Sequence, residues 1–186
     1  MKIEEKFIKY EELLKEWSTK MNLVAPSTLN DIQTRHIKDS AQLAKFLPKD
    51  ANIIDLGSGA GFPGVVLAIL GWNVTCIESI NKKTRFLQTL KQELDLPNLN
   101  IINDRIENYL SKTPVNAGDF IFTARAFAPL IKIIDYTHKT KCRLFLLKGR
   151  EIESEITTAK TKYQFDYKLH KSETGDGFII CINNVK

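Results

Sequence analysis

A glycine-rich loop constrains this sequence more than any other feature. Residues 53–56 (Ile-Ile-Asp-Leu) read as a buried parallel strand, and an apolar segment of helical character follows at 65–70. Four glycines lie between them, at Gly57, Gly59, Gly61 and Gly64. Glycines at this spacing let a backbone turn sharply and approach a ligand closely, because no Cβ stands in the way. The pattern predicts a ligand at the carboxyl end of a strand in an α/β fold.

An acidic residue, Glu78, lies 21 residues after Gly57, at the end of a second strand-like run, 73–78. A carboxylate in that place can accept hydrogen bonds from both hydroxyls of a ribose. Strand, loop, helix, strand and acid together therefore predict a cofactor that contains a nucleoside.

The glycines leave two cofactors open. The spacing from Gly59 to Gly64 satisfies the dinucleotide pattern G-x-G-x-x-G, which on its own is weak evidence. We favour S-adenosylmethionine over a nicotinamide dinucleotide because Asp55 directly precedes the loop. An anion there would repel a pyrophosphate and attract a sulfonium.

Strands and helices alternate from residue 52 onward. The expected strands are 52–56, 73–78, 99–102, 119–123 and 143–148, and the expected helices are 62–70, 81–94, 107–111, 129–137 and 151–160. This alternation predicts a mostly parallel sheet with helices on both faces. Two last strands, 165–170 and 177–183, form an antiparallel hairpin. The fold class expected is α/β, of the Rossmann-like class I SAM-dependent methyltransferases.

The N-terminal part is helical in pattern. Apolar residues recur at spacings of three and four from Ile3 to Met21, which predicts an amphipathic helix. A break follows, with Pro26, and a second helical stretch runs from about 29 to 47, in one piece or in two. We expect residues 1–48 to pack as a helical segment on a methyltransferase domain at 49–186.

Composition excludes several classes of protein. The 186 residues are 43% hydrophobic and 26% charged, as expected for a globular chain with a substantial core. No apolar run approaches the roughly 20 residues that span a bilayer, and the charged N-terminus does not resemble a signal peptide. Three widely separated cysteines indicate free thiols in a reducing compartment. We therefore expect a cytoplasmic protein that uses no membrane and no metal.

The positive charge is concentrated in one part of the chain. Residues 80–150 carry 13 basic and 6 acidic side chains, an excess of seven, whereas the rest of the chain is close to balance. A solvated helical face is the alternative, but such an excess beside a cofactor loop favours a nucleic-acid substrate. Lys82, Lys83 and Arg85 open a helix and are expected to point away from the loop crevice. The candidate RNA contacts are Arg35, His36, Lys82, Lys83, Arg85 and Lys148.

Two further groups of residues follow predicted strands and should reach the same crevice. Residues 104–107 (Asp-Arg-Ile-Glu) follow the third strand, where a backbone N–H and a polar side chain can read the adenine edge. A helix capping box from Asp104 to Glu107 is the alternative. Arg125 follows the fourth strand and can bind a carboxylate or an RNA phosphate, with a surface ion pair as the alternative.

The sequence motifs absent from the predicted crevice narrow the choice of the atom that accepts the methyl group. Residues 123–126 (Thr-Ala-Arg-Ala) stand where enzymes that methylate exocyclic amines carry a Pro-Pro-aromatic signature. Pyrimidine C5 methylation needs a cysteine nucleophile, and no cysteine lies in a predicted crevice loop. N7 of guanine has a free lone pair in the ring plane, so it needs neither device. We assign no general base and expect positioning to do most of the work, with Arg125 in a positioning role.

The loop at 55–64 (Asp-Leu-Gly-Ser-Gly-Ala-Gly-Phe-Pro-Gly) closely resembles the signature loop of the RsmG (GidB) methyltransferases. The resemblance covers roughly residues 15–150. It includes Trp17 with Lys20-Met21-Asn22-Leu23, Arg35-His36-Ile37-Lys38-Asp39-Ser40, Glu78-Ser79, Lys82-Lys83, Phe86-Leu87, Asp104-Arg105-Ile106-Glu107, Arg125-Ala126-Phe127 and Lys148-Gly149. This chain departs from the family pattern at Leu56, where isoleucine or valine is usual, and in its short C-terminus.

The resemblance implies a bacterial enzyme that transfers a methyl group from S-adenosylmethionine to N7 of a specific guanosine in 16S ribosomal RNA. Its partner would be the small ribosomal subunit or a precursor, and we expect a monomer. It implies cofactor contacts at Gly57, Phe62, Ile106, Glu107 and Arg125. Gly59 and Glu78 are cofactor residues from the logic of the fold. A methyltransferase for another RNA or a small molecule, and a nicotinamide-dependent oxidoreductase, remain as alternatives.

Overall fold

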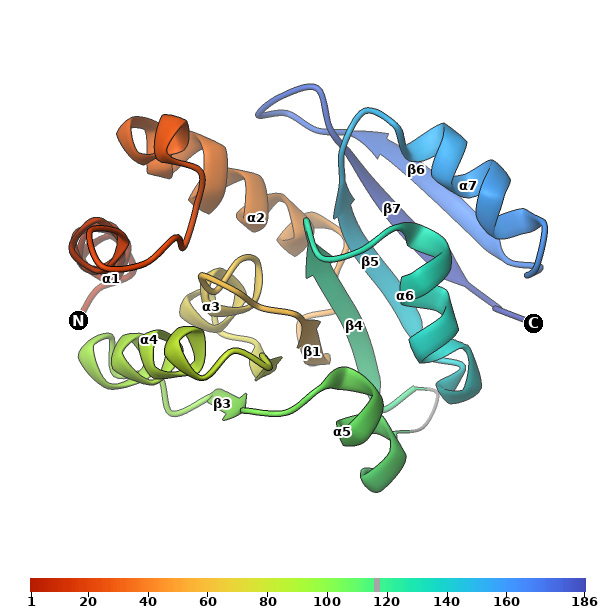
Figure 1. Cartoon of the computed structure of the whole chain (residues 1–186), viewed down its shortest axis with the longest axis horizontal. Helices are drawn as coiled ribbons and strands as arrows, with labels where there is room; N and C mark the ends of the chain where they lie inside the picture. The colour runs from red at the N-terminus through yellow and green to blue at the C-terminus, as the bar shows by residue number, and fades with distance from the viewer. Residues whose placement is uncertain (116–117) are drawn as a thin grey trace.

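A seven-stranded sheet forms the centre of the molecule (Figure 1). The structure is a computed structural model, and it describes residues 1–115 and 118–186. The strand order is β3-β2-β1-β4-β5-β7-β6. The strands are β1 (Asn52–Leu56), β2 (Asn73–Ile77), β3 (Leu99–Ile102), β4 (Phe120–Arg125), β5 (Arg143–Lys148), β6 (Asp166–Lys171) and β7 (Phe178–Asn183).

Strands β1 to β5 run parallel, and β7 lies antiparallel between β5 and β6. The predicted parallel sheet with a terminal hairpin is confirmed, and each strand end lies within two residues of the prediction. The strand order reverses between β1 and β4, which places their carboxyl ends on either side of a crevice. In open α/β sheets, ligands bind at such a switch point.

Alternating side chains divide the core in two, because successive residues of a strand point to opposite faces. Ile53 belongs to the core on one face of the sheet and Ile54 to the core on the other. On the first face pack α3 (Gly64–Ile69) and α4 (Asn81–Glu93). The other face is covered by α5 (Ile106–Lys112), α6 (Leu130–Thr137) and α7 (Ile152–Lys160), and the short 3₁₀ turn η4 (His138–Thr140) follows α6.

The N-terminal helix α1 (Ile3–Ser18) packs against α3 and α4 (Figure 1). Its apolar stripe explains the contact: Trp17 meets Phe86 of α4 with 5.4 Å between ring centroids. Tyr10 is fully buried, and its hydroxyl donates a hydrogen bond to the Ala60 carbonyl at 2.7 Å. The first helix therefore contacts the glycine loop directly.

The second helical stretch is helical as the sequence predicts, but it is divided into four short segments and not one or two. It consists of the 3₁₀ helix η1 (Pro26–Asp31), the π-helix η2 (Gln33–Lys38), one turn of α-helix α2 (Asp39–Ala41) and the 3₁₀ helix η3 (Gln42–Lys45). Within η2, His36 and Ile37 are buried, and the Arg35 carbonyl accepts a hydrogen bond from Arg125. Short π-helical segments recur at functional sites.

Among the described residues, no helix is both long enough and apolar enough to cross a bilayer.

Candidate cofactor and acceptor site

The glycine loop connects β1 to α3 through backbone conformations that other residues rarely adopt. Gly57, Gly59 and Gly61 have φ angles of +66°, +56° and +97°. A Cβ added at Gly57 would lie 2.2 Å from the Phe127 ring, whereas one at Gly59 would meet nothing closer than 3.8 Å. Gly57 is thus required both for its φ and for the close approach of Phe127, and Gly59 for its φ alone.

Asp55 lies beneath this loop and does not line the cavity. Its carboxylate is fully buried and accepts hydrogen bonds from the Gly64 N–H at 3.2 Å and the Thr123 hydroxyl at 3.1 Å. Burial raises the pKa of Asp55 to about 6. The expectation that Asp55 attracts a sulfonium was therefore wrong, and its role is to join the start of α3 to β4.

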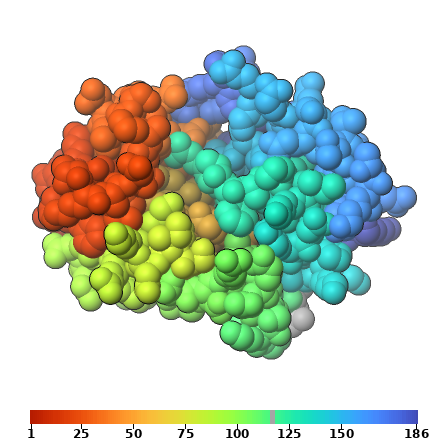
Figure 2. All heavy atoms as spheres, in the orientation of Figure 1, coloured from red at the N-terminus to blue at the C-terminus, as the bar shows by residue number. Residues whose placement is uncertain are grey.

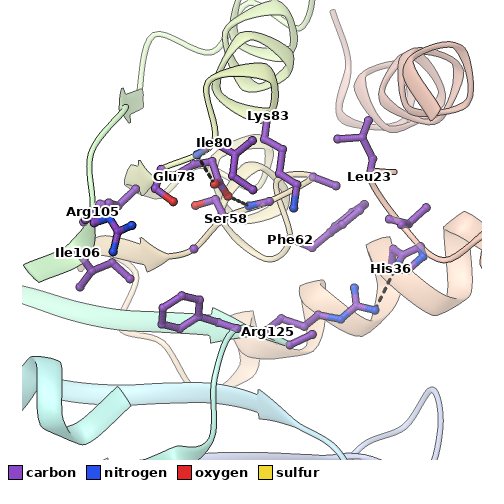
Figure 3. Close-up of a pocket in the computed structure, with 18 of the residues that line it drawn as sticks. Leu23, His36, Ser58, Phe62, Glu78, Ile80, Lys83, Arg105, Ile106 and Arg125 are labelled. Atoms are coloured by element: carbon purple, nitrogen blue, oxygen red, sulfur yellow. Dashed lines mark hydrogen bonds between the residues drawn. The ribbon is translucent and has the colours of Figure 1, made fainter. Parts of the chain in front are cut away.

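A cavity of about 770 Å³ opens at the carboxyl ends of β1 and β4. Figure 2 shows the hollow between the red N-terminal segment, the yellow-green α4 and the teal residues that follow β4. Figure 3 shows side chains around it from the N-terminal segment (Leu23 and His36), from α4 (Lys83) and from the end of β4 (Arg125). The lining includes all seven residues predicted to bind the cofactor: Gly57, Gly59, Phe62, Glu78, Ile106, Glu107 and Arg125.

Glu78 immediately follows β2 and connects two parts of the cavity wall. Its carboxylate accepts hydrogen bonds from the N–H groups of Gly59 at 2.9 Å and Ile80 at 2.8 Å, drawn as dashed lines in Figure 3. Each carboxylate oxygen has a second lone pair and can accept another donor. Glu78 can thus hold the glycine loop and still receive the two hydroxyls of a ribose.

Beyond Glu78, the cavity has an apolar end suited to a purine, formed by Ile80, Ile106 and the Phe127 ring. The capping box considered for Asp104 does not form, because its carboxylate accepts from the Arg105 N–H and the Asn108 amide instead.

Two aromatic side chains that line the cavity, Phe127 and Tyr136, were not predicted to be site residues, although Phe127 belongs to the motif at 125–127. Burial and a hydrogen bond to Glu107 raise the pKa of the Tyr136 phenol. The motif at 125–127 was an available signal for Phe127, and for Tyr136 the signal was its position on α6, the helix that follows β4.

The opposite end of the cavity is walled by a stack of rings. Phe62 lies between Tyr10 and His36, with ring centroids 5.2 Å and 5.0 Å away. The Arg125 guanidinium carbon lies 5.6 Å from the centroid of the Phe62 ring. Leu23, together with Val24, Ala25 and Thr28, completes this end. The N-terminal segment therefore forms part of the cavity wall.

Arg125 connects β4 to that segment. Its Nε lies 3.1 Å from an Asp39 carboxylate oxygen, and its Nη2 donates to the Arg35 carbonyl and meets His36 Nδ1, both at 2.8 Å. The Arg125 and Asp39 side chains are each only 19% exposed, so this is not a surface ion pair. Arg125 Nη1 is buried and has no hydrogen-bond partner among the described residues.

The hydrogen bonds around His36 define its protonation state. Because the guanidinium can only donate, Nδ1 must accept from Arg125. Nε2 then carries the proton and donates to the Thr28 hydroxyl at 2.8 Å, and that hydroxyl donates to the Ala25 carbonyl at 2.7 Å. Burial and the Arg125 charge lower the pKa of His36 to about 4. His36 is thus neutral at physiological pH and orients Arg125.

The other candidate RNA residues separate into three groups. Lys82 and Arg85 are exposed on α4, as Arg35 is on η2. Lys83 lines the cavity, so the expectation that it points away from the crevice was wrong (Figure 3). The Lys148 ammonium is held inside the protein, 2.6 Å from Glu155 and 2.9 Å from the Ala128 carbonyl.

Together these residues fit a nucleoside joined to a charged amino-acid tail. Glu78 stands where a ribose would bind, and apolar side chains stand where a purine would bind. Three cationic side chains, Lys83, Arg105 and Arg125, line the cavity and can attract a carboxylate. The ribose, the adenine and the carboxylate of S-adenosylmethionine match this distribution of side chains.

A family model described as rRNA small subunit methyltransferase G matches residues 3–176. The ribosomal RNA small subunit methyltransferase G of Orientia tsutsugamushi (strain Ikeda) is 43% identical over 175 residues, which cover 92% of this chain and 85% of the relative. That of Rickettsia prowazekii is 38% identical over 194 residues, covering 100% and 98% of the two chains.

Among solved structures, a SAM-dependent methyltransferase from Aquifex aeolicus superposes with a TM-score of 0.61 at 12% identity. The superposition covers 94% of this chain and 98% of that one. At this identity it shows the fold, which is that of the class I SAM-dependent methyltransferases, as the sequence predicts.

Proposed function

Since the chain belongs to the rRNA small subunit methyltransferase G family, we propose that it transfers a methyl group from S-adenosylmethionine to N7 of one guanosine in 16S ribosomal RNA. The observation that carries the proposal is the cavity itself. It joins a ribose-binding carboxylate and a glycine loop at one end to a cationic, ring-walled opening at the other.

The residues that would hold the cofactor follow from the geometry of the cavity. Glu78 would accept the ribose hydroxyls, the apolar end at Ile80 and Ile106 would cover the adenine, and Lys83 would receive the carboxylate. The Arg125 guanidinium, whose donors are bonded or buried, would add its positive charge to that side of the cavity. When bound, S-adenosylmethionine supplies an electrophilic methyl group on a sulfonium.

The acceptor requires no proton removal. The N7 lone pair of guanine forms the new N–C bond as the S–C bond breaks, and the sulfur keeps the electron pair. One positive charge moves from sulfur to the purine, so the number of charges in the site does not change. The neutral state of His36 and the pairing of Arg125 with Asp39 limit the uncompensated positive charge beside the methylated ring. Positioning of the two substrates and exclusion of water would account for the rate enhancement.

The N-terminal helical segment, residues 1–48, belongs to the acceptor side in this proposal, and residues 49–186 form the methyltransferase domain. The enzyme would act as a monomer in the cytoplasm on the small subunit or its precursor. Lys82 and Arg85 would meet the substrate outside the cavity.

Methyl transfer tests the proposal directly. Small ribosomal subunits that lack the modification, protein-free 16S RNA, transfer RNA and free guanosine are each incubated with the enzyme and a radiolabelled methyl donor, followed by nucleoside analysis. We expect label in 7-methylguanosine, close to one methyl group per small subunit, with far less in the other substrates. Efficient methylation of free guanosine, or label in a different nucleoside, would contradict the proposal.

A further inference from the structure

A second cavity of about 340 Å³ lies on the other side of Arg125. Arg125 and the neighbouring Ala126 line both cavities, so the two meet at the end of β4. The remaining walls come from η2, from the end of β5 and from the link between β6 and β7, residues 172–177. This second cavity therefore adjoins the ring-walled end of the first, the acceptor end, where the guanine would bind, and Glu78 does not line it.

Cations without partners stand at this second cavity. Arg35 and Arg150 are both exposed and line it, and neither guanidinium has a hydrogen bond or ion pair with a described residue. Lys148 also lines it, but its ammonium is bound to Glu155. Two arginines are thus free to bind a ligand.

The acids of the cavity do not cancel these charges. Asp39 is paired with Arg125 and accepts further hydrogen bonds from the Thr174 hydroxyl at 2.7 Å and the Ser172 hydroxyl at 3.3 Å. Asp176 is the one lining carboxylate without a partner in the described part of the chain, and it is exposed. Two unpaired guanidinium groups therefore face a single unpaired carboxylate.

The link between β6 and β7 adds backbone donors. The N–H groups of Gly175, Asp176 and Gly177 make no hydrogen bond with any described residue. A Cβ added at Gly175 or Gly149 would meet nothing within 4 Å, so the cavity is open at both glycines. Free backbone N–H groups beside arginines are a combination that binds phosphate.

We propose that this second cavity binds backbone phosphates of the RNA strand next to the target guanosine, through Arg35 and Arg150. The inference rests on the proposed function and specifies how the substrate is held. Arginine suits this role because its planar fork can make two hydrogen bonds to one phosphate. The strand would pass Arg125 on its way from the second cavity into the acceptor end of the first.

The test compares a double variant, Arg35→Gln with Arg150→Gln, to a control of equal charge, Lys139→Gln with Arg143→Gln. The control residues, Lys139 in η4 and Arg143 at the start of β5, are exposed near the amino end of β5, whereas the second cavity lies at its carboxyl end. Binding of a labelled single-stranded RNA is measured across a salt series, together with KM for small subunits and affinity for S-adenosylhomocysteine.

We expect the double variant to bind RNA at least about tenfold more weakly, because hydrogen bonds to charged groups are lost. The slope of log affinity against log salt should flatten by about 1.4, since each of the two lost contacts to single-stranded phosphate removes roughly 0.7. KM should rise while kcat and affinity for S-adenosylhomocysteine stay unchanged. Arg35→Lys with Arg150→Lys should keep the slope and regain only part of the affinity.

A double variant with the salt slope and RNA affinity of the control would overturn the inference, as would an equal loss of S-adenosylhomocysteine binding. RNA binding is read without methyl transfer. If the wild-type enzyme binds RNA through these arginines but methylates no ribosomal RNA, the proposed function fails and the phosphate site stands. If it methylates small subunits while the double variant matches the control, only the phosphate site fails.

Discussion

The two ends of the main cavity are built in different ways. The donor end is the end that contains the glycine loop and Glu78. There, buried carboxylates accept hydrogen bonds from backbone N–H groups of nearby segments: Glu78 accepts from Gly59, and Asp55 accepts from Gly64. At the acceptor end, side chains join segments far apart in the sequence: Arg125 bonds to the Arg35 carbonyl and to His36 of η2, and it pairs with Asp39 of α2. The donor end is therefore part of the sheet edge, whereas the acceptor end depends on how the N-terminal segment docks.

The largest effect should come from breaking the donor end at Gly57. In Gly57→Ala, the new Cβ would collide with Phe127 and the residue would be forced to keep φ at +66°. We expect affinity for S-adenosylhomocysteine to fall by about 100-fold or more, from a strain of about 1–3 kcal/mol plus the displaced ring. Isothermal titration calorimetry measures this.

Gly71→Ala is the matched control. Gly71 has φ at +110°, but a Cβ there meets nothing within 4 Å and the residue lies outside the cavity. The control should lose some stability and keep its donor affinity. Equal loss of binding in both variants would show that general backbone strain, and not the contact with Phe127, explains the effect.

Arg125→Ala attacks the acceptor end. It leaves the partly buried Asp39 carboxylate without its cation and removes the bonds to Arg35 and His36. Breaking such a pair should lower the free energy of unfolding by about 2–4 kcal/mol, measured by urea denaturation. Lys20→Ala, which removes an exposed pair with Glu16, should change it by less than about 0.5 kcal/mol. Similar small changes in both variants would refute the proposed role of Arg125 in docking the N-terminal segment.

Glu78→Ala should weaken cofactor binding by about 1–3 kcal/mol, because the ribose loses a charged acceptor and the loop loses its bond to Gly59. Glu78→Gln keeps one acceptor oxygen and should lose about half as much. Calorimetry with S-adenosylhomocysteine separates the two variants. Unchanged affinity in Glu78→Ala would exclude the ribose assignment.

Two adjacent lysines can show which part of α4 serves the donor. Lys83 lines the cavity and Lys82 is exposed outside it. We expect Lys83→Met to lower donor affinity by about fivefold to tenfold, the loss of one hydrogen bond to a charged group, and Lys82→Met to leave it unchanged. The reverse order, measured by the same titration, would contradict the orientation of α4.

The last prediction concerns the pH dependence of stability. The folded state keeps His36 neutral, so between pH 6.5 and about 4 the unfolded chain binds more protons there and stability falls as pH falls. Asp55, whose folded pKa is raised to about 6, acts in the opposite direction. His36→Asn removes the contribution of His36 to this pH dependence, and the amide oxygen of the new side chain can still accept a hydrogen bond from Arg125. We expect the wild type to lose about 1–2 kcal/mol more than the variant between pH 7 and 4.5. Identical pH dependence in urea denaturation would contradict a neutral, buried His36.

The difference between the donor end and the acceptor end also explains which parts of the site the sequence could predict. The strand, the glycines and Glu78 follow from local spacing, and all seven predicted cofactor residues line the cavity. The roles of Asp55 and Lys83 were mistaken because the sequence does not say which face of a buried strand, or of a first helical turn, meets the crevice.

The contacts that hold the acceptor end together could not be predicted, since they join Arg125 to Asp39 and His36 across nearly 90 residues, and no periodicity links these residues. The irregular helix η2 was also missed. Its shape depends on tertiary contacts at His36 and Arg35, and residue preferences do not encode these.

The claim that donor and acceptor ends are separate parts of one methyl-transfer site is tested by one titration series. S-adenosylhomocysteine is titrated into the wild type, Gly57→Ala and the double variant at Arg35 and Arg150. We predict that Gly57→Ala loses binding by about 100-fold or more and that the double variant binds as the wild type does. Wild-type affinity in Gly57→Ala, or a donor affinity in the double variant as low as predicted for Gly57→Ala, would contradict the account.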